Sequence, residues 1–206
     1  MDHHDFQNMR FLDNFQCIKT GDVVVDVGAC YGTYTKYFVN KLLGTGKIYS
    51  VELSPSNCEY LNRDFGGLSN VEIINSAVSD NFNEVSYYQG PTPETFNIIG
   101  HDTSFQQQDI AGKVQSTTLN ELLKDEPKVK LVKIDVEGSE LNVLRGMSEV
   151  YDKIEYILLE NHFDEDWPEI RKIILQDYGF ECYNIERQTE VTHESPRPYQ
   201  CLCQKK

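Results

Sequence analysis

The clearest pattern in the chain is a run of apolar, mostly β-branched residues at positions 22–27 that breaks into glycines and then into a helical repeat. An apolar run of this kind is typical of a central strand of a parallel sheet, covered on both faces. Tyr34, Phe38 and Leu42 then recur at helical spacing, and Gly44 ends the run. The pattern predicts a strand, a tight glycine turn and a helix.

Strand patterns recur along the chain and alternate with helical ones. We expect strands at residues 48–53, 71–75, 114–118, 129–135 and 154–159, and two last strands at 180–185 and 198–204. No helical pattern separates the last two, so they should pair antiparallel. The alternation predicts an α/β fold, a single domain over residues 1–206 with a mostly parallel sheet, an antiparallel last strand and helices on both faces.

Size and charge narrow the range of ligands. With 206 residues, 39% of them hydrophobic, the chain can bury one core. Its formal net charge is −14. The Lys and Arg residues that would neutralise phosphates are outnumbered, which argues against a nucleic-acid or anionic-membrane partner. A small neutral or cationic ligand fits better.

The six cysteines show no metal-ligand spacing, and several lie within apolar patterns. We therefore expect reduced thiols in a cytosol-like compartment and not a disulfide framework. The amino terminus lacks the pattern of a signal peptide, and no apolar stretch reaches transmembrane length. These features predict a soluble, cytoplasmic protein.

The glycine turn after the first strand is suited to binding a ligand. Gly28 and Gly32 allow close approach to the backbone, and the helix that follows presents unpaired N–H groups. The spacing differs from the dinucleotide fingerprint Gly-x-Gly-x-x-Gly. Asp-x-Gly-x-x-x-Gly instead resembles motif I of the class I methyltransferases that use S-adenosylmethionine (SAM), although purely structural glycines would give the same pattern. The resemblance implies a Rossmann-like fold with a seven-stranded sheet, and cofactor contacts from Asp26, Gly28, Ala29, Tyr31 and Gly32.

Three predicted strands end in a carboxylate, at Asp26, Glu52 and Asp135. The carboxyl ends of parallel strands meet at one edge of a sheet, so these acids should converge on a shared crevice. An acid at the place of Glu52 accepts hydrogen bonds from ribose hydroxyls in nucleotide-binding α/β folds. Asp135 and three residues that follow neighbouring strands complete the expected cofactor site: Leu53, and the small Ser76 and Ala77, which leave room for adenine.

Residues 133–141, Lys-Ile-Asp-Val-Glu-Gly-Ser-Glu-Leu, resemble the signature of the FkbM family of methyltransferases. Residues 24–29 match motif I of the same family, and residues 118–122 resemble its Thr-Leu-Asp segment. The likeness covers most of the chain. It departs at Cys30, where the family usually has Asn, and at Asn120, where it usually has Asp. The resemblance implies SAM-dependent O-methylation of a hydroxyl on a sugar, a glycan or another small hydroxylated compound.

The methyl acceptor is expected beside Glu137, Glu160 and His162. Glu160 and His162 lie two apart on an extended segment, so they should face the same way. His162 is a candidate general base because its ordinary pKa lies near neutral. Glu137 is a candidate for proton handling or for holding the amino group of the cofactor.

A divalent metal ion is a further expectation for this region. Asp135, Glu160 and Asn161 resemble the ligands of Mg²⁺-dependent catechol-type O-methyltransferases, and hard oxygen ligands suit Mg²⁺. A bound ion would lower the pKa of an acceptor hydroxyl. The alternative is that Glu160 and Asn161 only bond the backbone or the cofactor.

Two segments lie outside the strand–helix alternation. Residues 1–20 predict a helical lead-in, and the irregular residues 81–114 predict an insertion on the acceptor side. The insertion contains His101 and Asp102, which either take part in the chemistry or form an exposed pair. Two other functions stay open: a catalytically inactive methyltransferase-like binding or scaffold protein, and an NAD-dependent dehydrogenase, which the glycine spacing disfavours.

Overall fold

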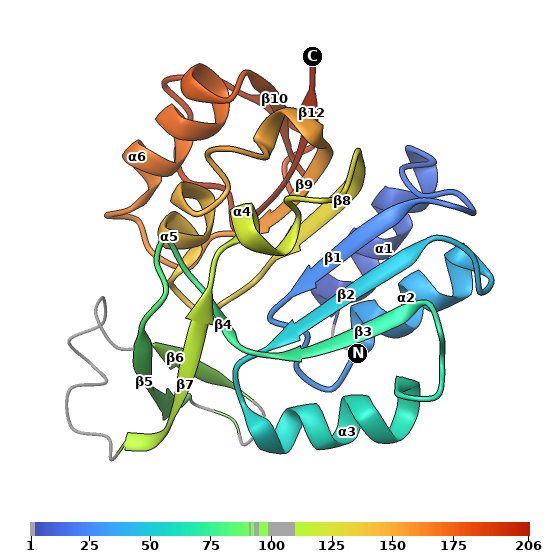
Figure 1. The fold of residues 1–206 in the computed structure, drawn as a ribbon. Coiled ribbons are helices and arrows are strands. Elements are labelled where there is room, and N and C mark those ends of the chain that lie inside the picture. The colour runs from blue at the N-terminus through green and yellow to red at the C-terminus, as the bar shows by residue number, and fades with distance from the viewer. Residues whose placement is uncertain (1–2, 91, 93–94, 99–109) are drawn as a thin grey trace.

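A computed structural model describes residues 3–90, 92, 95–98 and 110–206. Its main sheet has eight strands in the order β11-β10-β12-β9-β8-β1-β2-β3 (Figure 1). The strands are β1 (Val23–Val27), β2 (Lys47–Glu52), β3 (Val71–Asn75), β8 (Val129–Ile134), β9 (Ile154–Glu160), β10 (Phe180–Asn184), β11 (Thr189–Val191) and β12 (Gln200–Lys205).

The pairing of these strands follows the expected mixture. From β3 to β9 all neighbours are parallel. β12 is antiparallel to both β9 and β10, so the prediction for the last two strands is confirmed. The expected count of seven strands is one short. The eighth strand, β11, lies between the last two predicted strands and extends the sheet edge, because it forms a short antiparallel hairpin with β10.

Helices cover both faces of the sheet. α1 (His3–Asn14) and α2 (Thr33–Leu42) pack on one face through a cluster around Leu12, Phe38 and Leu42. On the other face lie α4 (Leu119–Leu122), α5 (Glu140–Arg145) and α6 (Trp167–Lys172), which leads into a π-helical turn at Ile173–Asp177. α3 (Pro55–Phe65) follows β2; Ser54 caps it and Pro55 opens it.

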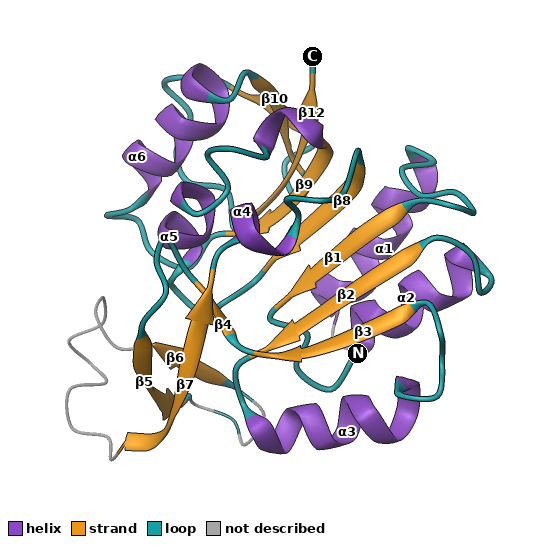
Figure 2. Ribbon diagram, in the orientation of Figure 1, coloured by secondary structure: helices purple, strands orange, loops and turns teal. Residues whose placement is uncertain are grey.

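A second, four-stranded sheet contains the described part of the expected insertion. Its order is β4-β7-β5-β6, with β4 (Ala77–Val78), β5 (Glu84–Gln89), β6 (Phe96–Ile98) and β7 (Ile110–Thr117). The strand predicted at 114–118 therefore belongs to this sheet and not to the main one. Figure 2 shows the second sheet beyond the carboxyl ends of β1, β2 and β3. His101 and Asp102 lie outside the described residues.

The cysteines differ from expectation at one place. Cys182 on β10 and Cys203 on β12 form a disulfide, whereas we expected reduced thiols. The two residues are direct partners in the antiparallel register, which brings their side chains together on one face. The other four cysteines, Cys201 among them, form no disulfide. Among the described helices none is both long and apolar enough to cross a membrane.

Candidate functional site

A cavity of about 430 Å³ opens where the parallel strands β1, β2, β8 and β9 end. The second sheet closes part of it with residues from β4 and β6. Ten of the expected site residues line it: Gly28, Ala29, Tyr31, Glu52, Leu53, Ser76, Ala77, Asp135, Glu137 and Glu160. Asp26, Gly32, Asn161 and His162 are not in its lining.

The turn after β1 is held close to the neighbouring strands. Gly28 has a φ of +77°, and a Cβ there would lie 1.8 Å from the carbonyl oxygen of Asp135. Glycine is therefore required by close backbone approach as well as by conformation. Gly32 lies against the ring of Phe65 on α3, and a Cβ there would lie 2.4 Å from that ring. A larger residue at this position would therefore push the turn away from α3. Cys30, between Gly28 and Gly32, also adopts a left-handed φ of +50°, which is uncommon for a residue with a side chain.

Glu52 has most of its hydrogen-bonding capacity committed to the protein. Oε1 accepts from the N–H of Ser54 at 2.9 Å and from Nδ2 of Asn57 at 3.4 Å, while Oε2 accepts from the N–H of Cys30 at 2.8 Å. Burial raises the pKa of Glu52, and these donors oppose that effect. A carboxylate has about four acceptor positions. Glu52 thus fixes the glycine turn and the start of α3.

Asp26 lies beneath the cavity and acts through Lys133. It is fully buried and accepts a hydrogen bond from Thr35 at 2.8 Å. The ammonium of Lys133 lies 3.4 Å from Asp26 and 3.3 Å from Asp135, and it donates to the carbonyl of Gly28 at 2.8 Å. Asp26 is thus linked to the cavity through Lys133, and the cofactor contact expected for it stays a prediction. Burial lowers the pKa of Lys133, but the charges of Asp135 and Asp26 outweigh it and raise the pKa above its ordinary value.

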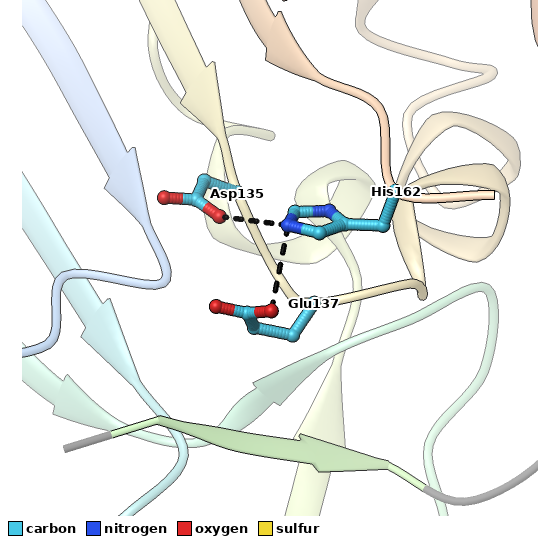
Figure 3. Close-up of side chains that lie close together, drawn as sticks. All are labelled: Asp135, Glu137 and His162. Atoms are coloured by element: carbon cyan, nitrogen blue, oxygen red, sulfur yellow. Dashed lines mark ion pairs between the residues drawn. The ribbon is translucent and has the colours of Figure 1, made fainter. Parts of the chain in front are cut away.

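His162 stands among four carboxylates. Its Nε2 lies 3.4 Å from Glu137, 3.6 Å from Glu160 and 3.9 Å from Asp135, as Figure 3 shows for the first and last of these. Its Nδ1 lies 2.9 Å from Glu140. Burial lowers the pKa of His162, but the hydrogen bond to Glu140 and the surrounding charges outweigh it and raise the pKa to about 9. The ring is therefore an imidazolium at neutral pH.

Glu140 anchors this arrangement. It is 2% exposed, and its Oε1 also accepts from the N–H of Gly138 at 3.0 Å and of Val136 at 3.3 Å. Glu137 and Gly138 have left-handed φ values of +54° and +107°. Glu140 thus holds a strained turn that points Glu137 toward the cavity.

Glu160 completes the acidic side of the cavity. It accepts hydrogen bonds from the hydroxyl of Tyr199 and, at 2.7 Å, from Nε2 of Gln200. Burial and the charge of Asp135 raise its pKa to about 6. At neutral pH it is therefore mostly a carboxylate, with a pKa suited to accepting a proton.

The expectation that Asp135, Glu160 and Asn161 bind Mg²⁺ stays a prediction. Asn161 is fully buried and its Nδ2 donates to the carbonyl of Pro198 at 3.1 Å, so its amide serves the loop before β12. Asp135, Glu137 and His162 bring possible ligand atoms within 4.8 Å of one another. In this group the positively charged ring of His162 lies beside the carboxylates of Asp135 and Glu137.

Comparison with known proteins identifies the chain. The model of the methyltransferase FkbM domain matches residues 26–182, more than half of the sequence. The chain belongs to the FkbM methyltransferase family. Residues 26–182 therefore form an FkbM methyltransferase domain.

Relatives of this FkbM methyltransferase include a hexuronic acid methyltransferase, AglP of Haloferax volcanii, which is 24% identical over 156 residues. The match covers 74% of the chain and 61% of that relative's length. A crystal structure of methyltransferase FkbM from Methylobacillus flagellatus shares the fold with a TM-score of 0.57 and 16% identity, over 91% of this chain and 44% of that one. A SAM-dependent O-methyltransferase from Thermotoga maritima has a TM-score of 0.54 and 14% identity, over 97% and 64%.

Two residues of the site were not assigned from the sequence of this FkbM methyltransferase. Lys133 and Glu140 both lie in the segment that resembles the family signature, but neither was given a role. Lys133 lies in a strand, where a polar residue usually alternates with core residues and faces solvent. Glu140 lies in the first turn of a helix, where an acidic residue is common. Their charge in an otherwise apolar context is the signal that could have found them.

Proposed function

We propose that this methyltransferase transfers the methyl group of SAM to a hydroxyl oxygen of a sugar or another small hydroxylated compound. The observation that carries the proposal is the pair of carboxylates, Glu137 and Glu160, that line the cavity together with Asp135. Carboxylates accept hydrogen bonds from hydroxyl groups. They repel an anionic acceptor, so a hydroxyl suits the cavity better than a carboxylate does.

The cofactor is assigned to the opposite side of the cavity. The position of Oε2 of Glu52 suits one ribose hydroxyl, and Leu53, Ser76 and Ala77 are assigned to the adenine. Gly28, Ala29 and Tyr31 would contact the rest of the cofactor from the glycine turn. This places the sulfonium toward Asp135, where negative charge stabilises it.

In the proposed reaction the acceptor oxygen attacks the methyl carbon in line with the sulfur. The O–CH₃ bond forms while the S–CH₃ bond breaks, the electron pair goes to sulfur, and S-adenosylhomocysteine (SAH) leaves. We assign the hydroxyl proton to Glu160 and not to His162, because the carboxylates around His162 hold its proton at neutral pH. Glu137 would orient the acceptor, and much of the rate gain would come from positioning.

A sugar is the favoured acceptor because the Haloferax volcanii relative is a hexuronic acid methyltransferase. The net charge of −14 disfavours RNA. The test supplies methyl-labelled SAM with matched hexuronides and neutral hexosides, and with RNA as a further arm. We expect a labelled sugar whose methyl group survives mild alkali, as an ether does. An alkali-labile methyl ester, or label in RNA alone, would refute the proposal.

Variants separate turnover from binding. Glu160→Gln should lower kcat by about 100-fold or more while SAH binding is kept, since general-base catalysis contributes about that much. Glu165→Gln, in the exposed loop after β9, is the matched control and should keep full activity. SAH binding by the wild type without methyl transfer to any acceptor of the panel would favour the scaffold alternative.

A further inference from the structure

The cavity is strongly unbalanced in charge. Four acids line it, Glu52, Asp135, Glu137 and Glu160, and among the described lining residues Lys133 is the one base. SAM brings two positive groups, the sulfonium and the α-ammonium, but also an α-carboxylate. That carboxylate needs a cationic partner, because an unpaired charge in a partly buried acidic site is costly.

Lys133 lies where such a partner is useful. It sits on β8 opposite Asp26 on β1, and its side chain is 5% exposed. Its ammonium contacts the backbone carbonyl of Gly28, at the start of the glycine turn. The ring of Tyr34 lies beside it, with the ammonium 5.1 Å from the ring centre. The side chain is thus fixed at the junction of β1, β8 and α2.

The two carboxylates that pair with Lys133 differ in freedom. Asp26 is fully buried and also held by Thr35, whereas the side chain of Asp135 is 28% exposed and lines the cavity. Asp26 therefore keeps the ammonium charged and in place. Asp135 is the partner that a ligand can replace.

We propose that Lys133 binds the α-carboxylate of SAM, exchanging its contact with Asp135 for the ligand, and so selects cofactors that carry the complete amino-acid end. Asp135, once released, accepts from the α-ammonium. The inference rests on the cofactor of the family and not on the identity of the acceptor. Failure of the sugar proposal would leave the binding comparison below unchanged.

The test compares two ligands by calorimetry. SAH carries the amino-acid end, and 5′-methylthioadenosine lacks it. Lys133→Met should weaken SAH by about 10- to 100-fold, the range for one hydrogen bond to a charged group, and change 5′-methylthioadenosine by less than threefold. Lys130→Met is the matched control, on the same strand but paired with Glu155 away from the cavity. It should change neither ligand more than twofold.

Loss of Lys133 leaves Asp26 buried without its cation, so stability needs its own control. The double variant Asp26→Asn with Lys133→Met removes both charges and should restore the melting temperature without restoring SAH affinity. A second measurement uses the wild type alone, which should bind decarboxylated SAH at least tenfold more weakly than SAH. Equal weakening of SAH and 5′-methylthioadenosine in the variant, or a wild type indifferent to the carboxylate, would overturn the proposal.

Discussion

The contact between Gly28 and the end of β8 makes a sharp prediction for Gly28→Ala. Gly28 and Gly44 have almost the same backbone conformation, with φ values of +77° and +78°. An added Cβ at Gly44 meets nothing within 4 Å, whereas at Gly28 it would lie 1.8 Å from the carbonyl oxygen of Asp135. Gly44→Ala therefore measures the cost of the conformation alone, and the difference between the variants measures the close approach.

The magnitudes follow from those two contributions. A left-handed conformation costs an alanine about 1–2 kcal/mol, and both variants pay it. At Gly28 the obstacle is backbone, which cannot rotate away as a side chain can, so the ends of β1 and β8 must separate. Overpacking of this kind costs about 1–3 kcal/mol more. We expect the free energy of unfolding to fall by about 2–5 kcal/mol in Gly28→Ala and by about 1–2 kcal/mol in Gly44→Ala.

Urea unfolding and SAH calorimetry together test this reasoning. The separation of β1 from β8 also moves Asp135 and the turn, so Gly28→Ala should weaken SAH at least tenfold, an estimate of roughly 1.4 kcal/mol. Gly44→Ala should bind SAH within twofold of the wild type. Equal stability of the two variants, or unchanged SAH affinity in Gly28→Ala, would show that the ends of β1 and β8 are not held together as the structure indicates.

Three further predictions concern Glu52, His162 and the disulfide. In Glu52→Gln an amide N–H faces one of the N–H groups from which Glu52 now accepts a hydrogen bond, so SAH should bind at least about tenfold more weakly. The control Glu155→Gln, at the far end of β9, should not change SAH binding. The pKa of His162 is raised to about 9, so the stability it contributes, up to about 3 kcal/mol, is present below its ordinary pKa of about 6.5 and lost as pH rises to 9. Urea unfolding of the wild type and His162→Gln should therefore differ most near pH 6 and converge near pH 9; a constant difference would contradict this. Thiol titration of the denatured, unreduced protein should detect four thiols, because Cys182 and Cys203 are joined, and a count of six would refute the disulfide.

The sequence predicts this fold well where a pattern is local. The strand ending at Val27, the glycine turn and the carboxylate of Glu52 follow from periodicity and spacing within about thirty residues. The convergence of Glu52 and Asp135 on one cavity follows from parallel pairing, because carboxyl ends of parallel strands share an edge. These predictions needed no knowledge of register.

The contacts that depend on register were not predicted from the sequence. Asp26 and Lys133 are direct partners across β1 and β8, so the carboxylate of Asp26 pairs with the ammonium of Lys133 beneath the cavity. The disulfide likewise depends on Cys182 facing Cys203 across β10 and β12. Periodicity fixes which face a side chain takes, but not which residue of the next strand lies opposite it.

The segment from Lys133 to Glu140 explains why one short motif can organise the site. On β8 the side chains alternate, so Lys133 and Asp135 point to the cavity edge while Ile134 between them is buried in the core. The left-handed turn at Glu137 then breaks this alternation and returns a third charge to the same place. Glu140, one turn later, bonds back to that turn and to His162. Lys133 pairs with Asp135, and His162 pairs with both Glu137 and Glu140. Replacing any one of these charged residues should therefore disturb both the cofactor side and the acceptor side of the cavity.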